Sequence, residues 1–207
     1  MSSAAADVRT VFVVDDDASV RDSIALLLSL RGYRTAVFAK AEDFLQAWRP
    51  EWSGCVLTDI RMPGKSGLEL QTELAAQGVG LPVVFLTAHG DVASARQAFR
   101  NAAVDFLVKP YDEVQLCAAI DAAFEREQMR LDALEQRRLH QARIAGLSAR
   151  EREVMALMVR GLNHRDIGER LGISPRTVEV HKARVMAKLE ANNLAELIRI
   201  SSASSAP

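Results

Sequence analysis

The feature that most constrains the fold of this chain is a fivefold repetition of a short apolar run followed by a helix-like segment. The apolar runs, rich in β-branched residues, cover Thr10–Val14, Thr35–Phe38, Cys55–Thr58, Val83–Leu86 and Val104–Val108. Each run is continuous rather than alternating, which is typical of a strand buried on both faces. The segments between them place apolar residues at helical spacing, as Val20, Ile24 and Leu28 show. This alternation predicts a doubly wound α/β fold, in which a five-stranded parallel sheet carries helices on both faces.

Polar residues with obvious chemistry follow four of these strands. They are Asp15, Asp16, Asp17, Asp59, Thr87 and Lys109. In doubly wound sheets the carboxyl ends of the strands meet at one edge, where ligands bind. Clustered carboxylates repel one another unless a cation joins them, and oxygen ligands suit Mg²⁺. The sequence therefore predicts a magnesium site at this edge.

The same residues belong to four motifs, VVDDD at 13–17, TDIRMPG at 58–64, LTAHGD at 86–91 and VKP at 108–110. Together and in this order, the motifs resemble the receiver domain of bacterial two-component response regulators, over residues 8–126. The resemblance implies a flavodoxin-like or CheY-like sheet with strand order 2-1-3-4-5. It also implies that the domain catalyses only its own phosphorylation and dephosphorylation, so the protein is not expected to be an enzyme otherwise.

The resemblance implies a role for each residue at the strand ends. Asp59 is the phosphoacceptor. Asp16 binds Mg²⁺ directly, and Asp15 binds it mainly through water. Asp59 and the backbone carbonyl of Arg61 complete the set of metal ligands. Lys109 pairs with the phosphate, and Pro110 follows a cis peptide bond.

The resemblance further implies a switch. Thr87 bonds a phosphate oxygen after transfer, and Phe106 fills the space that Thr87 leaves. Such a change is a two-state response to the charge that phosphorylation adds. Two neighbours have simpler interpretations, Asp17 as an acid in the first turn of a helix and His89 as a loop residue.

Charge divides the chain into an acidic and a basic part. Residues 1–124 carry 11 Lys and Arg against 16 Asp and Glu, a net charge of −5, while residues 145–207 carry 10 against 7, a net charge of +3. Such asymmetry suggests two modules with different partners. Between them, residues 127–144 lack Pro and Gly and predict a helical linker, either a short coiled coil or a solvated spacer.

Residues 145–203 predict a small all-α domain of four helices. Ser148 and Glu151 form a capping-box pattern before the first helix, and Gly161 follows that helix. A short helix at 164–170 and a longer one that begins at Ser174-Pro175 form a helix-turn-helix pattern, and a fourth helix follows at 194–200.

Three stretches in this part resemble the DNA-binding domain of the LuxR/NarL family, and the last is especially similar to its FixJ subgroup. They are LSAREREV, GLNHRDIGERLGIS and SPRTVEVHKARVMAKL. The resemblance implies that residues 174–189 form the recognition helix, and that the helix from Leu194, with Leu197 and Ile198, mediates dimerisation. The expected DNA-binding residues are Asn163, Arg176, Thr177, Glu179, Val180, Lys182, Arg184 and Lys188. From composition alone, the cationic surface could equally be a solvated helix face.

These observations lead to a functional hypothesis of a phosphorylation-activated transcriptional regulator. A sensor histidine kinase would phosphorylate Asp59, and the protein would then dimerise, bind double-stranded promoter DNA and act on RNA polymerase. One alternative is a Mg²⁺-dependent phosphatase, but such enzymes need an acid two residues after the nucleophile, where this chain has Arg61. Another is a constitutive DNA-binding protein whose receiver is only a docking domain.

Composition also bears on the compartment. The chain has no run of about 18 apolar residues and no secretory signal, so no contact with a membrane is expected. Cys55 and Cys117 are expected to be reduced core thiols. These features predict a bacterial cytoplasmic protein, with residues 1–7 and 204–207 disordered.

Overall fold

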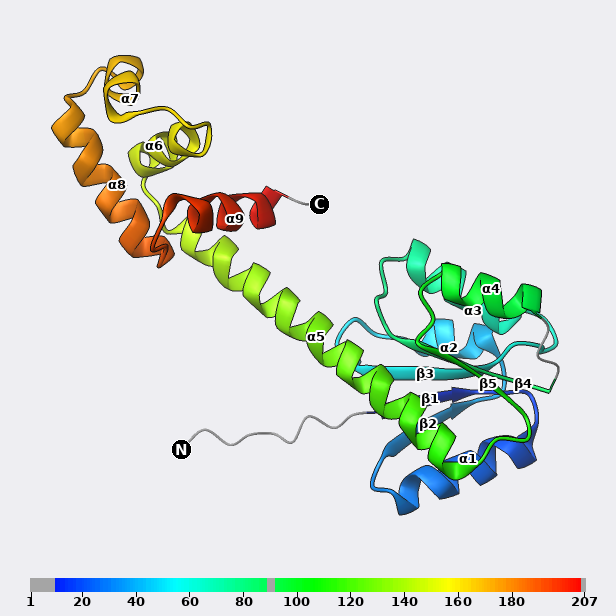
Figure 1. Ribbon diagram of the computed structural model, residues 1–207. Helices are drawn as coiled ribbons and strands as arrows, with labels where there is room; N and C mark the ends of the chain where they lie inside the picture. The colour runs from blue at the N-terminus through cyan, green and yellow to red at the C-terminus, as the bar shows by residue number, and fades with distance from the viewer. Residues whose placement is uncertain (1–9, 89–91, 206–207) are drawn as a thin grey trace. The chain divides into compact units, whose positions relative to one another are not determined.

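The computed structural model describes residues 10–88 and 92–205 (Figure 1). The chain divides into two compact units, residues 1–130 and 131–207. Residues 1–7, which were predicted to be disordered, and His89 lie outside the described residues. Within the described part of the chain, no helix is both long enough and apolar enough to cross a membrane.

In the first unit, strands alternate with helices along the chain. The elements are β1 (Thr10–Val14), α1 (Ala18–Leu30), β2 (Arg34–Phe38), α2 (Ala41–Ala47), β3 (Gly54–Asp59), α3 (Gly67–Ala76), β4 (Val83–Thr87), α4 (Val92–Arg100), β5 (Asp105–Val108) and the first part of α5 (Glu113–Ala145). All strand pairs are parallel, and the strand order is β2-β1-β3-β4-β5. The predicted α/β fold and its strand order are confirmed.

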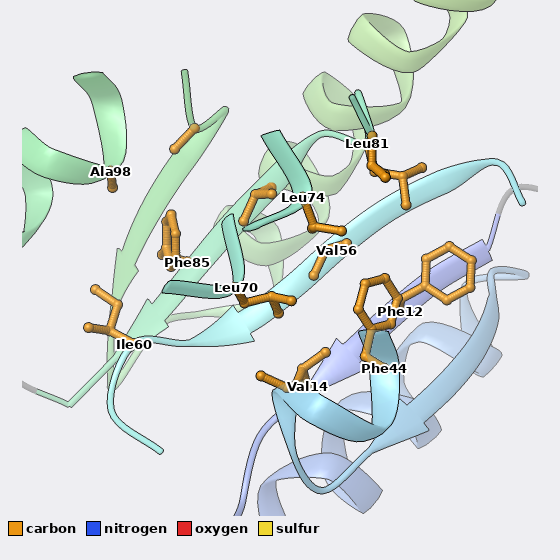
Figure 2. Close-up of a cluster of buried hydrophobic side chains, with 14 of the residues drawn as sticks. Phe12, Val14, Phe44, Val56, Ile60, Leu70, Leu74, Leu81, Phe85 and Ala98 are labelled. Carbon is orange, nitrogen blue, oxygen red and sulfur yellow. The ribbon is translucent and has the colours of Figure 1, made fainter. Parts of the chain in front are cut away.

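The sheet is buried on both faces because successive side chains enter two different apolar clusters. Phe12 and Val14 of β1 lie in a cluster with Phe44 of α2, part of which Figure 2 shows. Val11 and Val13 lie in the other cluster, with residues of α1 and α5. In Figure 1, α1 and α5 accordingly cover one face, while α2, α3 and α4 cover the other. This double burial explains why the strands are continuously apolar.

The strand register brings the carboxyl ends of the strands to one edge of the sheet. Val14 of β1 pairs with Phe38 of β2 and with Thr58 of β3, and Asp59 pairs with Leu86 of β4. β2 and β3 lie on opposite sides of β1, so the strand order reverses there. Doubly wound sheets bind ligands at such a point.

α5 is one continuous helix of 33 residues, Glu113–Ala145, and it includes the predicted linker. Its first part buries Leu116, Ile120 and Phe124 in the first unit. In the second unit, Leu134 is 45% exposed. The choice between a coiled coil and a solvated spacer stays a prediction.

The second unit contains four further helices after α5. They are α6 (Ala149–Val159), α7 (His164–Leu171), α8 (Pro175–Leu189) and α9 (Leu194–Ser205). Ser148 and Glu151 form the predicted capping box, and Ser174 caps α8 with Pro175 in its first turn. Gly172 ends α7 with a left-handed φ of 64°, which glycine adopts without strain. The helices enclose a separate apolar core that includes Val154, Ile167, Val178 and Leu197.

The C-terminal helix is longer than predicted. α9 continues to Ser205, so the prediction of disorder is wrong for residues 204 and 205. Ser201–Ser205 contains neither Gly nor Pro, and extending an existing helix costs far less than starting one. Residues 206–207 lie outside the described range.

Candidate functional site

Three charged side chains meet at the carboxyl edge of the sheet in the first unit. The ammonium Nζ of Lys109 lies 2.8 Å from Asp59 Oδ2 and 2.9 Å from Asp15 Oδ2. Asp15 is 1% exposed and Asp59 is 9% exposed. Buried carboxylates are costly unless they are paired. Lys109 therefore supplies the positive charge that both carboxylates need.

The environment of Lys109 keeps this side chain charged. Burial by itself lowers the pKa of Lys109, but hydrogen bonds to Asp59 and Asp15 outweigh burial, so the pKa is raised overall. The Lys109 backbone N–H donates to the carbonyl of Thr87 at 2.7 Å, which ties β5 to β4 at this edge. The following Lys109–Pro110 peptide bond is cis, as the resemblance implied.

The loop after β3 folds back onto Asp59. Oδ1 of Asp59 accepts a hydrogen bond from the backbone N–H of Arg61 at 2.9 Å. The other oxygen, Oδ2, is bound to Lys109. The backbone N–H of Arg61 is thus held beside the carboxylate, while the residue as a whole is exposed.

The residues present fit a divalent cation in donor type and in charge. Asp16 is exposed at the same edge, next to Asp15. Asp15, Asp16 and Asp59 with Lys109 carry a net charge of −2, which one divalent cation would balance. Carboxylate and carbonyl oxygens are the ligands that Mg²⁺ prefers. Among residues 10–88 and 92–205, no three acidic, His or Cys side chains already surround a single metal position.

Asp17 has a structural role at this edge. It caps α1, and its Oδ1 accepts hydrogen bonds from the backbone N–H of Ser19 at 2.8 Å and from the Ser19 hydroxyl at 2.6 Å. These hydrogen bonds lower the pKa of Asp17. Asp17 was predicted to lie in the first turn of the helix, and it lies one position earlier, at the N-cap of α1.

The two predicted switch residues lie on neighbouring strands and on one face of the sheet. Thr87 is 1% exposed and pairs with Val108 of β5, and Phe85 pairs with Phe106. Because side chains two residues apart share a face, Thr87 and Phe106 both face the cluster that contains Phe85. Phe106 is only partly buried there. The two residues thus share one face of the sheet on neighbouring strands, and a coupled change between them stays a prediction.

One residue near the site gave no signal in the sequence. The guanidinium of Arg21 in α1 donates to the backbone carbonyl of Asp15 at 2.6 Å. Arg21 therefore helps to hold the carboxyl end of β1. Its spacing from Asp15 matches no motif, so only the fold shows this contact.

The second unit presents a charged helix face opposite its core. Val178, Val185 and Leu189 bury one side of α8. Arg176, Glu179 and Arg184 are exposed on the helix, and Val180 is 46% exposed, while Thr177 and Lys182 are partly buried. Cations and hydrogen-bonding groups on one exposed helix face suit phosphates and base edges.

Two residues of this face converge on His164, the first residue of α7. Nδ1 of His164 lies 3.6 Å from Glu179 Oε1, and Nε2 lies 3.4 Å from Lys182 Nζ. α7 thus restrains an acidic and a basic group on α8 together. His164 was not among the predicted site residues.

Comparison with known families accounts for both units. Residues 11–121 match the family described as the response regulator receiver domain, and residues 145–201 match the family described as bacterial regulatory proteins of the LuxR family. This chain belongs to the LuxR-type response regulators. It is therefore a two-component response regulator with a DNA-binding domain.

Individual relatives align over nearly the whole length of this response regulator. The transcriptional regulatory protein FixJ of Azorhizobium caulinodans is 46% identical over 190 residues, which cover 92% of this chain and 90% of FixJ. Among solved structures, response regulator StyR aligns with a TM-score of 0.78 at 41% identity, over 94% of this chain and 98% of that chain. Full-length FixJ from B. japonicum aligns with a TM-score of 0.58 at 40% identity, over 95% and 97% of the two chains.

The structure gives two of the predicted DNA-binding residues internal bonds. Lys188 Nζ lies 2.7 Å from Glu151 Oε2 and 3.3 Å from the Gly146 carbonyl, and Glu151 is 4% exposed. Asn163 caps α7, and its Oδ1 accepts from the N–H groups of Arg165 and Asp166, both at 3.0 Å. DNA contact by either residue stays a prediction. Both side chains also form hydrogen bonds within the second unit in the absence of DNA.

The predicted dimerisation residues do not form one surface on this response regulator. Leu194 is 44% exposed and Ile198 is 40% exposed, but Leu197 is 0% exposed in the core of the second unit. Leu197 and Ile200 lie three positions apart and share the inner side of α9, whereas Leu194 and Ile198 share another side. The prediction for Leu197 is therefore wrong, because the helix turns it into the core.

Proposed function

We propose that this response regulator accepts a phosphoryl group on Asp59 from a sensor histidine kinase. The observation that supports this most directly is the Lys109 ammonium held between Asp59 and Asp15. A carboxylate and an anionic phosphoryl group repel each other, so the reaction depends on positive charge placed in advance. Lys109 is such a charge, and it lies within hydrogen-bonding distance of the nucleophile.

In the proposed reaction, a carboxylate oxygen of Asp59 forms the new bond to phosphorus as the phosphorus–nitrogen bond of the phosphohistidine breaks. The imidazole leaves with the bonding electron pair. Mg²⁺ would act as a Lewis acid that withdraws electron density from the phosphoryl oxygens. The residues that would hold it are Asp15, Asp16, Asp59 and, through its carbonyl, Arg61. The Arg61 N–H and Lys109 orient the Asp59 carboxylate for attack. Hydrolysis of the acyl phosphate would return Asp59 to its starting state.

The proposed output is dimerisation and binding to promoter DNA. Phosphorylation adds charge beside Thr87, which moves to bond a phosphate oxygen, and Phe106 turns inward. The altered surface pairs two copies, so that two DNA-binding domains reach a two-fold site together and bind far more tightly than one. The proposed DNA-contacting side chains are Arg176, Thr177, Glu179, Val180, Lys182 and Arg184. The protein would act on RNA polymerase in the bacterial cytoplasm.

This proposal can be tested with the full chain and a small phosphodonor. Acetyl phosphate or beryllofluoride with Mg²⁺ is added, the molar mass is followed by light scattering, and DNA affinity is followed by fluorescence anisotropy. We expect doubling of the mass and tighter DNA binding, both lost in Asp59→Ala. If the wild type changes in neither measurement, activation by phosphorylation is ruled out. If Asp59→Ala binds DNA as tightly as the activated wild type, the protein is a constitutive DNA-binding protein.

A further inference from the structure

A carboxylate of α2 reaches across to the loop that follows the phosphoacceptor. Oε1 of Glu42, in the first turn of α2, accepts a hydrogen bond from the backbone N–H of Lys65 at 2.9 Å. The bond joins residues 23 positions apart in the sequence. Backbone hydrogen bonds, from its own N–H and from that of Lys65, lower the pKa of Glu42. The acceptor is therefore charged at neutral pH, which strengthens the bond.

Both partners of this bond are anchored in the same apolar cluster. On the α2 side, Phe44 is 0% exposed, and its ring lies 5.6 Å from that of Phe12. On the loop side, Ile60 is 5% exposed and Met62 is 8% exposed. Figure 2 shows Phe44 and Ile60 in this cluster. The bond thus joins α2, which the cluster holds in place, to the part of the loop that follows Met62 and leaves the cluster.

The backbone of the loop comes unusually close to the carboxylate at Gly64. This residue has a φ of +78°, and a Cβ atom placed on it would lie 2.8 Å from Glu42 Oε1. A side chain at this position would be strained in its backbone and would meet the carboxylate. The Pro63-Gly64 pair therefore does more than form a turn, because its glycine makes room for Glu42.

The loop that Glu42 holds carries a proposed metal ligand. At its start, the Arg61 N–H is bound to Asp59 Oδ1 at 2.9 Å, and at its end the Gly67 N–H donates to the Ile60 carbonyl at 3.1 Å. Glu42 holds the stretch between these two points. Without that bond, the segment from Met62 to Lys65 loses a tether to the body of the domain. The peptide unit that begins with the Arg61 carbonyl lies directly before this segment.

We propose that Glu42 is a positioning residue for metal binding, which fixes the loop so that the Arg61 carbonyl is in place for Mg²⁺. This inference rests on the proposed function, since it concerns the same metal site. Glu42 acts on the site through the loop backbone. Residues that orient metal ligands in this way commonly change metal affinity 10- to 100-fold when they are replaced.

The test uses the full chain with Mg²⁺ alone and no phosphodonor. The variants are Glu42→Ala, which removes the acceptor, and Glu42→Asp, which keeps the charge but withdraws it by one methylene group. Glu42→Gln keeps an acceptor oxygen, and Asp43→Ala is the matched control because it removes a neighbouring exposed carboxylate from the same turn. Calorimetric titration gives the Mg²⁺ dissociation constant, and NMR hydrogen exchange follows the Lys65 amide.

We expect Glu42→Ala and Glu42→Asp to raise the Mg²⁺ dissociation constant roughly tenfold and to speed exchange at Lys65. Glu42→Gln should stay within about threefold of the wild type, and Asp43→Ala should match it. Faster exchange at Lys65 with an unchanged dissociation constant would show a purely structural bond and overturn the inference. Unchanged exchange would overturn it as well. If the wild type binds no Mg²⁺, the proposed function fails together with the inference. If the wild type binds Mg²⁺, and the separate acetyl phosphate experiment shows that it is phosphorylated, only the Glu42 inference is at stake.

Discussion

At the residue scale, two lysines with different predicted roles each form an ion pair with a buried carboxylate. The Lys109 side chain is 22% exposed and lies between two buried carboxylates, one of them the proposed phosphoacceptor. The Lys188 side chain is 45% exposed and binds Glu151, the buried acid of a helix cap. Removing either ammonium would leave a buried carboxylate without its counter-charge, which is costly. Lys109 therefore neutralises the two carboxylates at the strand ends, and Lys188 neutralises the buried acid of the second unit.

The pair formed by Lys188 and Glu151 predicts an acid-sensitive second unit. The hydrogen bond from Lys188, followed by that from the Ser148 backbone, lowers the pKa of Glu151 to about 2, against about 4.3 in an unfolded chain. A lowered pKa gives stability that is complete above the unfolded value and is lost as pH falls through the folded one. We expect the free energy of unfolding of this unit to decline between about pH 4.3 and pH 2. Denaturant titration, followed by NMR signals of residues 131–205, measures this decline.

Two variants separate the contribution of Glu151 to this decline from that of other acidic residues. Glu151→Gln and Lys188→Ala should both be less stable than the wild type at neutral pH and should flatten the decline below pH 4.3. Arg165→Ala, which removes an exposed pair with Glu169, is the control and should keep the wild-type pH profile. If the free energy of unfolding of Glu151→Gln declines at low pH as it does in the wild type, another group causes the decline.

At the scale of elements, the second unit depends on the side chains that begin its helices. Three of these helices each have an N-cap side chain that accepts a hydrogen bond from a backbone N–H in the first turn. The caps are Ser148 for α6, Asn163 for α7 and Ser174 for α8. The helix-turn-helix geometry also needs a close approach at Gly168, where a Cβ atom would lie 2.7 Å from the Ile173 carbonyl. The caps fix where α7 and α8 start, and Gly168 lets α7 pack closely against the turn that leads into α8.

Asn163 allows the capping role to be separated from DNA contact. Asn163→Ala should destabilise the second unit by about 1 kcal/mol, because two backbone N–H groups lose their acceptor. Asn163→Ser, which keeps a capping oxygen, should be nearly as stable as the wild type. If the role is capping alone, Asn163→Ser should also keep the affinity for DNA and its salt dependence, measured by anisotropy. A large loss of affinity in this stable variant would show that Asn163 contacts DNA.

At the scale of the whole molecule, the two units have separate cores and separate tasks. The clusters on the two faces of the sheet contain residues of the first unit, and the third cluster is confined to the second. A ligand at the carboxyl edge of the sheet binds only the folded first unit. Its binding energy therefore adds to the stability of that unit by mass action.

This separation predicts two calorimetric transitions that respond differently to ligands. Mg²⁺ with beryllofluoride at about 100 times its dissociation constant should stabilise the first unit by about 2.7 kcal/mol and raise only its transition temperature. Asp59→Ala should abolish the shift. Lys188→Ala, which weakens the second unit, identifies the other transition. A single transition that moves as a whole would contradict independent unfolding of the two units.

The sequence by itself determined the fold class, the strand order through the resemblance, the helix-turn-helix pattern and the set of residues at the carboxyl edge. It could do so because continuous apolar runs, helix caps and strand-end motifs are local features of the chain. The tertiary structure alone decided the internal bonds of Lys188 and Asn163, the burial of Leu197, and the contacts made by Arg21, Glu42 and His164. Those features depend on which distant group lies within hydrogen-bonding distance and on which side of a helix meets the core. The local sequence pattern shows neither the distant partner of a residue nor the side of a helix that meets the core. Both are set only when segments far apart in the sequence pack together.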